Sequence, residues 1–242
     1  MKMASSEDQK SPKVLALIPA YNESERVGKV IKEVLTYLPV LVVDDGSADE
    51  TSLASKTAGA EVIRQEPNQG KGAALLNGFR YALEHQYDAV ITLDADGQHA
   101  ADEIPLFLED FYGKGSDLII GKRDFKKMPF PRCYTNQIGT WSFSRAMQQY
   151  IPDNQSGYRL HSRRLIEAAI QSQERGFEFE VEIILTCVLK GYSLSWVPIK
   201  TIYNKRQNSK ITPIRHVWRF YRLVWRTRQI MRAHLRSLNE NS

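Results

Sequence analysis

The sequence has 242 residues, of which 42% are hydrophobic and 25% charged, and a net charge of +5 at pH 7. This composition is that of an ordinary globular protein and excludes fibrous and wholly disordered classes. No apolar run approaches the roughly 20 residues of a membrane-spanning helix. The first residues lack the apolar core of a signal peptide, and two cysteines give neither a disulfide framework nor a zinc pattern. We therefore expect a cytoplasmic protein.

The first half of the chain alternates short apolar runs with helix-like patterns. Strands are predicted at residues 14–18, 40–45, 60–64, 88–94 and 116–121. These runs are apolar throughout, which is typical of parallel strands covered by helices on both faces. The segments between them have helical periodicity. The pattern predicts a single α/β domain with an open, mostly parallel sheet that binds ligands beyond the carboxyl ends of its strands.

The alternation ends after Gly121. We expect a basic, proline-punctuated loop over residues 122–136, helices over 137–150 and 180–191, and one or two strands within 193–204. A final helix is predicted from Pro213, with Thr212 as its N-cap.

Charge is distributed unevenly along the chain. Residues 200–242 carry eleven lysines and arginines and one glutamate, a net +10, which leaves −5 for residues 1–199. The predicted final helix is basic and amphipathic, because aromatic and aliphatic residues share one face and arginines line another. A basic segment of this kind favours an anionic partner. The helix could pack on the domain as core, lie on a membrane surface, or do both.

Polar motifs begin where the predicted strands end. Asp94 and Asp96 follow the fourth strand, and they could clamp Mg²⁺ or Mn²⁺ with Gln98 as a further oxygen ligand. An ordinary turn with a helix-start carboxylate is the alternative. In the stretch NQGKG, Lys71 is a candidate phosphate partner between two glycines that allow close approach of a ligand. That stretch matches neither a Walker A loop nor G-x-G-x-x-G.

The motifs IPAYNE (18–23), VVDDGSADET (42–51), NQGKGAALLNGF (68–79) and LDADGQH (93–99) together resemble the family-two inverting glycosyltransferases of GT-A fold. The later stretches GKR, DNQSGYR, FEFEVEIIL, GYSLSWVPI and YNKRQNSKI look most like the dolichyl-phosphate or polyprenyl-phosphate mannosyl- and glucosyltransferase branch. The resemblance covers residues 13–212. It implies a nucleotide-sugar half at about 13–121 and an acceptor half at about 122–212, flanked by a disordered tail (1–12), the basic helix (213–237) and a second tail (238–242).

The resemblance also implies residue roles. Nucleotide-sugar binding falls to Pro19, Tyr21, Glu23, Asp44, Asp45, Gly46, Lys71, Asp94, Ala95 and Asp96. Asp94, Asp96 and Gln98 would hold the metal. The acceptor phosphate would be bound by Arg123, Arg132, Asn136, Arg159, Arg206 and Lys210, although the family often has serine at the Asn136 position. The catalytic assignments are Asp96, Arg123 and Asp153.

The expected reaction is transfer of mannose or glucose from a nucleotide-sugar, GDP-mannose or UDP-glucose, to a polyprenyl or dolichyl phosphate at the cytosolic membrane face. A phosphate acceptor is already anionic and needs no general base. A hydroxyl acceptor on a saccharide or protein would need one, for which Asp153 and Glu182 are candidates. A non-catalytic nucleotide-sugar binding or membrane-adaptor module is a further alternative. A separate membrane subunit is compatible with the sequence. No nucleic-acid recognition motif is present, and the histidines are interpreted as ordinary polar residues.

Overall fold

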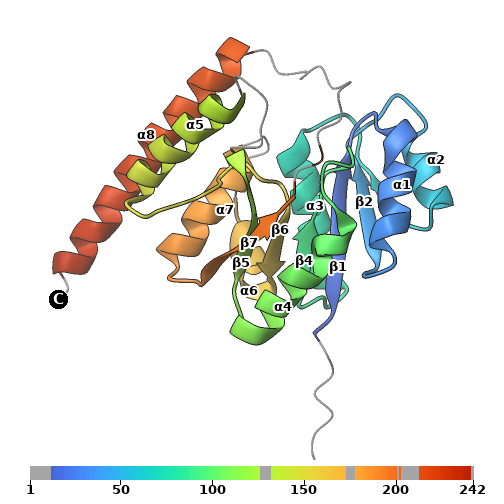
Figure 1. Ribbon diagram of the computed structural model, residues 1–242, viewed down its shortest axis with the longest axis horizontal. Coiled ribbons are helices and arrows are strands. Elements are labelled where there is room, and N and C mark those ends of the chain that lie inside the picture. Colours follow the sequence, from blue (N-terminus) through green and yellow to red (C-terminus); the bar gives the residue numbers. More distant parts are fainter. Residues whose placement is uncertain (1–11, 126–131, 173–177, 201, 203–212, 241–242) are drawn as a thin grey trace, which may run out of the picture.

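The chain folds around one seven-stranded sheet with helices on both faces (Figure 1). The computed structural model describes residues 12–125, 132–172, 178–200, 202 and 213–240. In chain order the elements are β1 Val14–Ala20, α1 Ser24–Val34, β2 Val40–Asp44, α2 Thr51–Thr57, β3 Glu61–Arg64, α3 Lys71–Glu84, β4 Ala89–Thr92, the 3₁₀ turn η1 Ala101–Glu103, α4 Ile104–Lys114, β5 Leu118–Arg123, α5 Arg132–Met147, β6 Arg159–Ser162, α6 Arg163–Ala169, α7 Glu178–Leu189, β7 Leu194–Ile199 and α8 Pro213–Glu240.

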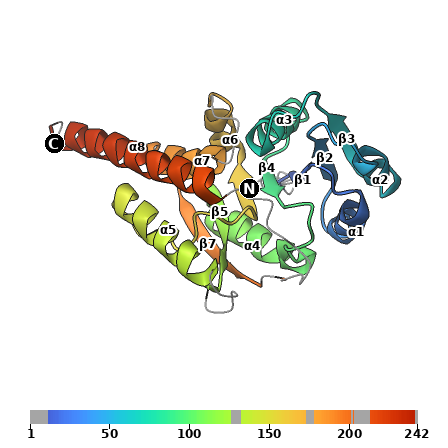
Figure 2. The ribbon, with the colours of Figure 1, turned by 90° about the horizontal axis from the view of Figure 1, so that it is seen from above.

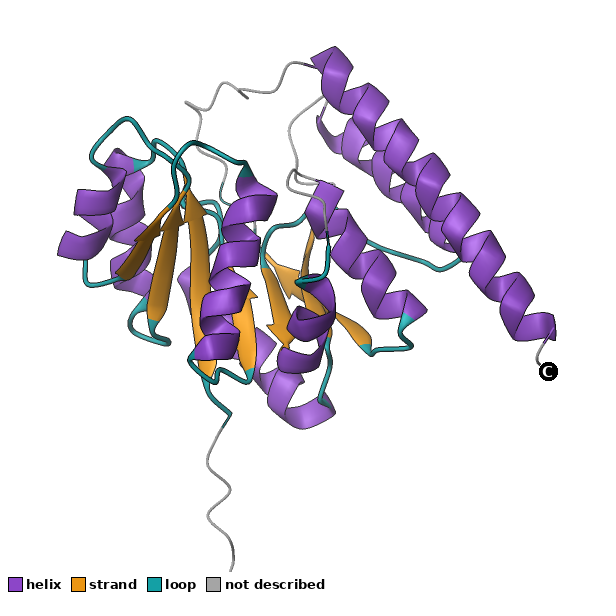
Figure 3. Cartoon of the chain, turned by 180° about the vertical axis from the view of Figure 1, so that it is seen from behind, coloured by secondary structure: helices purple, strands orange, loops and turns teal. Residues whose placement is uncertain are grey.

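The strand order is β3-β2-β1-β4-β6-β5-β7. β6 runs antiparallel to both of its neighbours, and the other neighbouring pairs are parallel. The predicted open, mostly parallel α/β sheet is therefore confirmed. The carboxyl ends of β1, β2, β4 and β5 consequently lie at one edge of the sheet, the edge at which an open α/β sheet binds ligands (Figure 3).

Helices cover the sheet from two sides, as the view from above shows (Figure 2). Alternate residues of β1 serve the two layers: Leu15 and Leu17 pack with α3 and α7, and Ala16 and Ile18 pack with α1 and α4. This alternation is the two-residue period of a strand. Both layers are needed because every side chain of β2 is buried.

Several boundaries differ from the sequence prediction. α8 continues to Glu240, into the expected second tail at 238–242. β1 continues through Pro19, which pairs with Val43 of β2. On its other side, the pairing of β1 with β4 ends two residues earlier, at Leu17. A proline lacks the N–H for a second ladder, so this half-paired position tolerates it. β5 extends to Arg123 because β7 pairs with it along its whole length. α5 begins at Arg132, inside the segment expected to be a loop.

α8 packs alongside α5 and also contacts α7 (Figures 1 and 2). Its residues Leu223, Thr227 and Met231 are buried, and Leu223 and Met231 belong to the hydrophobic cluster that includes Phe143 and Met147 of α5. One face of α8 is thus part of the core. Within the described residues, no helix has the length and apolar character needed to cross a membrane.

Candidate active site

Asp94 and Asp96 lie in a tight turn directly after β4. The strand ends at Thr92, and Gly97 has a φ of +75°, a conformation that glycine adopts without strain. Both carboxylates are half-buried. Asp96 accepts hydrogen bonds from Gln98, at 2.9 Å from the backbone N and 2.7 Å from Nε2. Gln98 therefore supports Asp96 through its amide nitrogen.

Lys71 joins the aspartate turn to α7. Its Nζ lies 2.6 Å from Oδ1 of Asp94 and 3.3 Å from Oε1 of Glu180, which is buried. Lys71 is the first residue of α3, after Gly70 with a φ of +93°. Burial alone would raise the pKa of Asp94. The charges of Lys71, His99 and Arg123, together with the hydrogen bond from Lys71, outweigh burial and hold that pKa well below its usual range. Asp94 is therefore ionised at neutral pH.

His99 and Gly157 complete the surroundings of Asp94, and the sequence analysis assigned a function to neither. Nδ1 of His99 accepts a hydrogen bond from the backbone N of Asp94 at 3.1 Å, and burial lowers the pKa of its imidazole. A Cβ on Gly157 would lie 2.9 Å from Asp94 Oδ2 and 2.9 Å from Lys71 Nζ. Only glycine leaves room for the ion pair at this position.

Glu180 was also missed, because the sequence analysis singled out Glu182 of the same helix. Glu182 instead accepts a hydrogen bond from Ser172 at 2.6 Å. The available signal was the four-residue spacing of Glu178, Glu182 and Thr186, which places Glu180 on the opposite, buried face of α7. A buried carboxylate requires a cationic partner.

Asp44 and Asp45 fix the loops at the end of β2. Asp45 is buried and accepts hydrogen bonds from the backbone N–H groups of Gln69 at 2.7 Å and Gly70 at 2.9 Å. Asp44 is fully buried and accepts one from the backbone N of Ser47 at 2.9 Å. Asp45 thereby positions the glycine-containing loop that precedes Lys71, and Asp44 fixes the turn that follows β2.

The remaining residues assigned to the nucleotide-sugar lie around this edge. Tyr21 is exposed just beyond β1, and the half-buried Glu23 forms an ion pair with Arg26 at 2.5 Å. Gly46 has a φ of +70°, and a Cβ there would lie 2.9 Å from the backbone N of Asn68. Pro19 is half-buried in β1, and Ala95 is buried between the two aspartates.

Arg123 and Asp153 form a two-pronged ion pair at the carboxyl end of β5. Nε of Arg123 lies 2.7 Å from Oδ2 of Asp153, and Nη2 lies 2.9 Å from Oδ1. Asp153 is fully buried and also accepts the backbone N–H groups of Gln155 and Ser156. Arg123 retains a small exposed fraction, and its positive charge contributes to the low pKa of Asp94. The arginine therefore lies at the same edge as the aspartate turn.

Arg159 does not have the surroundings of a phosphate-binding residue. Its side chain is 1% exposed, and its guanidinium donates to the backbone carbonyls of Ser156 at 2.6 Å, Asn154 at 3.0 Å and Glu180. With its donors directed at these carbonyls, the acceptor-phosphate role expected for Arg159 is not supported. Arg159 instead ties the Asp153 loop to the helix that carries Glu180.

The other residues assigned to the acceptor phosphate are less completely described. Asn136 is half-buried on α5. The backbone of Arg132 starts that helix, and its side chain lies outside the described residues, as do Arg206 and Lys210 entirely.

The turn offers the ligand chemistry that Mg²⁺ and Mn²⁺ prefer. Asp94 and Asp96 contribute carboxylate oxygens, which suit these cations. Within the described part of the chain, no three His, Cys, Asp or Glu side chains form a metal-binding group. Two carboxylates fit a cation whose remaining ligands are water and the phosphates of a bound nucleotide.

The chain is similar in sequence to two named enzymes. The polyprenol monophosphomannose synthase of Mycolicibacterium smegmatis is 32% identical over 77% of this chain and 76% of its own length. A UDP-N-acetylglucosamine–dolichyl-phosphate N-acetylglucosaminyltransferase of Methanococcus voltae is 28% identical over 87% of this chain and 94% of its own length.

A solved structure shows the same fold. Glucosyl-3-phosphoglycerate synthase from Mycobacterium tuberculosis, in complex with Mn²⁺, UDP and phosphoglyceric acid, matches with a TM-score of 0.69 at 19% identity, over 89% of this chain and 77% of that chain. The family model for glycosyl transferase family 2 matches residues 16–171, which include the aspartate turn, Lys71 and the Arg123–Asp153 pair. The chain belongs to glycosyl transferase family 2.

Proposed function

We propose that the protein is an inverting hexosyltransferase that moves mannose or glucose from a nucleotide-sugar to a polyprenyl phosphate, with Mg²⁺ or Mn²⁺ as its cofactor. The observation that carries this proposal is that two carboxylates and an arginine–aspartate ion pair lie at the same edge of the sheet. Asp94 and Asp96 follow β4, and the Arg123–Asp153 pair follows β5. Carboxylates suit a cation, and an arginine suits an anionic acceptor.

On the donor side, Asp94 and Asp96 would hold the cation, and Lys71 would contact the donor diphosphate. A bound divalent cation neutralises the charge that develops on the leaving nucleoside diphosphate. Asp45 holds the loop before Lys71, so the lysine is positioned before the donor arrives. Tyr21 and Glu23, beyond β1, would border the nucleoside. We assign residues 13–121 to this donor half and residues 122–212 to the acceptor half.

On the acceptor side, the Arg123–Asp153 pair favours a phosphate over a hydroxyl. A hydroxyl acceptor needs a carboxylate within reach to take its proton. Asp153 is fully buried and accepts hydrogen bonds from Arg123, Gln155 and Ser156. Glu182 is engaged by Ser172. A polyprenyl phosphate requires no such base, and Arg123 provides the positive charge that would attract it. Asp153 then acts as the residue that orients Arg123.

The names of two relatives support the acceptor class. The mycobacterial relative is named for a polyprenol phosphate product and the Methanococcus relative for dolichyl phosphate. One name gives mannose and the other N-acetylglucosamine, so the names do not select a donor sugar. We propose GDP-mannose or UDP-glucose as the donor. We further propose that the enzyme works at the cytosolic membrane surface, that α8 contributes to its attachment, and that no nucleic acid is involved. A separate membrane subunit would be compatible with this arrangement.

The test is a transfer assay with purified protein, radiolabelled GDP-mannose or UDP-glucose, and a short polyprenyl phosphate, with and without Mn²⁺ or Mg²⁺. Label should enter the lipid only in the presence of a divalent cation. Thermal-shift measurements would identify the donor beforehand, because a ligand that binds only the native state raises the melting temperature. Efficient transfer to a neutral hydroxyl acceptor, with none to the lipid phosphate, would overturn the proposed acceptor.

A further inference from the structure

The outer faces of α5 and α8 carry matching stripes of exposed residues. On α5 the stripe is Tyr134, Ile138, Trp141 and Arg145, and on α8 it is Tyr221, Trp225, Arg228 and Arg232. Both have the spacing i, i+4, i+7, i+11, which places residues on one helix face. The aromatic rings are largely exposed, with Trp141 at 65% and Trp225 at 62%. Such a concentration of large exposed apolar side chains marks an interaction surface.

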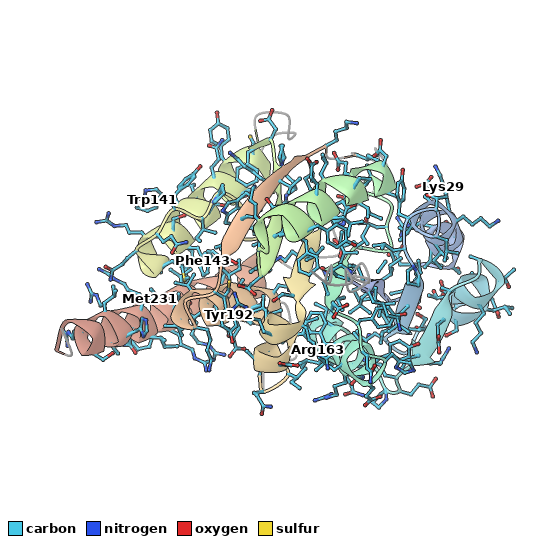
Figure 4. All side chains as sticks on the ribbon, turned by 90° about the horizontal axis from the view of Figure 1, so that it is seen from below. Lys29, Trp141, Phe143, Arg163, Tyr192 and Met231 are labelled. Atoms are coloured by element: carbon cyan, nitrogen blue, oxygen red, sulfur yellow. The ribbon has the colours of Figure 1, made fainter. Side chains whose placement is uncertain are left out.

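Parts of the two stripes line one crevice, because Trp141 and Arg145 of α5 and Arg228 and Arg232 of α8 share its walls. Trp141 lies on the outer side of α5, whereas Phe143 and Met231 lie between the helices and the body (Figure 4). Phe220 of α8 approaches Gly139 of α5, and further along both helices the crevice is lined by Arg145 of α5 and by Arg228 and Arg232 of α8. The two helices therefore run in the same direction, with aromatic residues at their amino-terminal parts and arginines beyond.

A crevice of about 570 Å³ opens between the carboxyl-terminal part of α5 and α8. Its walls include Trp141, Arg145 and Tyr150 from α5 and the segment after it, and Arg228 and Arg232 from α8. Tyr150 is 74% exposed at the rim.

Among the described residues, the three arginines of the crevice have no acidic partner. Neither α5 nor residues 213–239 of α8 contain an aspartate or glutamate. Among the residues that the structure describes, Arg145, Arg228 and Arg232 form no ion pair. Three like charges lining one crevice repel each other, and a bound anion would relieve that repulsion. Guanidinium groups bind phosphate through paired hydrogen bonds, so a phosphate group is the ligand that this chemistry favours.

We propose that the outer surface of α5 and α8 docks on an anionic bilayer, and that the crevice binds the phosphate of an anionic phospholipid headgroup. Tryptophan and tyrosine rings have an apolar body and a polar edge, which suits them to the headgroup layer of a bilayer. The neighbouring arginines would be attracted to the negative charge of anionic lipid phosphates. The inference rests on the proposed membrane-surface function of α8. The inference adds α5 to the membrane-docking surface of α8. It also adds a binding site for a lipid headgroup that is separate from the proposed active site.

The test measures flotation of the full chain with vesicles of phosphatidylcholine alone and of phosphatidylcholine mixed with phosphatidylglycerol. The wild type should bind the mixed vesicles, less so at high salt, and the neutral ones weakly. Each arginine near an anionic surface contributes roughly fivefold in binding. Arg228→Ala/Arg232→Ala should therefore weaken binding about 30-fold, and Arg145→Ala on α5 about fivefold. Trp141→Ala should weaken binding to both vesicle types.

The matched control is Arg222→Ala/Arg236→Ala, which removes the same charge from exposed positions of α8 outside the crevice. It should weaken binding less than the crevice pair. Equal losses in the two double variants, no effect of Arg145→Ala, or tighter binding to an oligonucleotide than to mixed vesicles would overturn the inference. A wild type that binds no vesicles would overturn both the inference and the membrane part of the proposed function. The sugar-transfer proposal is judged separately, with a short water-soluble polyprenyl phosphate. Circular dichroism confirms that each variant is folded.

Discussion

Lys71 and Asp94 form an ion pair of 2.6 Å, and the same ammonium lies 3.3 Å from Glu180. One lysine thus pairs with two carboxylates, one of them at the first position of the proposed metal clamp. The pair links the first turn of α3 to the turn after β4, and Gly157 leaves room for it. A divalent cation at Asp94 would have to share that carboxylate with the lysine, and the donor diphosphate would offer Lys71 an alternative partner.

Replacing Lys71 tests this sharing. Lys71→Met would remove the ammonium that pairs with both Asp94 and the buried Glu180, and we expect a loss of about 2 kcal/mol in the free energy of unfolding, since Asp94 is partly exposed. Added Mn²⁺ should then raise the melting temperature of this variant more than that of the wild type. Lys71→Arg keeps the charge and serves as the control. Identical Mn²⁺ shifts in all three proteins would show that the lysine and the cation do not compete for Asp94.

Replacing Asp96 tests the metal clamp itself. Asp96→Asn keeps the shape of a half-buried residue whose hydrogen bonds come from Gln98, so the melting temperature should change little. Metal-dependent transfer should fall by at least about 100-fold, because charge stabilisation of the leaving group is lost. Asp102→Asn, at an exposed carboxylate eight positions from Asp94, is the charge-matched control. Near-normal turnover of Asp96→Asn would rule out the clamp.

Much of this edge was predictable because its geometry follows from strand order. Apolar runs indicated the strands, and parallel strands bring the residues that follow them to one edge, so Asp45, Asp94 and Lys71 were expected near each other. The Arg123–Asp153 pair was not, although both residues were singled out. They are 30 positions apart, and their pairing depends on β6 returning antiparallel between β4 and β5. No local pattern in the sequence encodes that return.

Burial was the other quantity that the sequence did not reveal. Arg159 matches a family position and has the chemistry of a phosphate ligand, yet its donors serve backbone carbonyls. The choice between Glu180 and Glu182 depended on the rotation of α7 about its axis, and the half-buried face of that helix carries Glu178, Glu182 and Thr186. The spacing of four residues marks that face, but only tertiary packing brings Lys71 to Glu180.

Arg123 offers a test of the acceptor class. Arg123→Lys keeps a positive charge but cannot form the two-pronged pair with Asp153, and we expect at least a tenfold loss in transfer to polyprenyl phosphate. Slow hydrolysis of the nucleotide-sugar, which needs no acceptor, should change little. Arg123→Ala should be worse in both stability and transfer, because it leaves the buried Asp153 unpaired. Parallel losses in transfer and hydrolysis by Arg123→Lys would contradict an acceptor role.

Asp117, at the opposite end of β5 from Arg123, gives a pH-dependent prediction. It is 2% exposed and accepts hydrogen bonds from Arg164, from Ser162 at 2.8 Å, and from Ser193 at 2.8 and 2.9 Å. Burial would raise its pKa, but these partners outweigh it and lower the pKa to about 2. The folded pKa lies below the unfolded value, so the stabilisation is complete above about pH 4 and is lost as the pH falls through about 2.

The shift corresponds to about 2 kcal/mol in the free energy of unfolding. Asp117→Asn should therefore unfold more easily at pH 7 by about that amount, and its stability should fall less steeply between pH 4 and pH 2 than that of the wild type. Urea unfolding at a series of pH values measures both effects. Asp102→Asn, at an exposed position, should follow the wild-type curve. Because Asp117 lies away from the proposed active site, transfer by the folded variant should be unchanged at neutral pH. Parallel pH curves for Asp117→Asn and the wild type would show that this carboxylate does not carry the acid sensitivity of the fold.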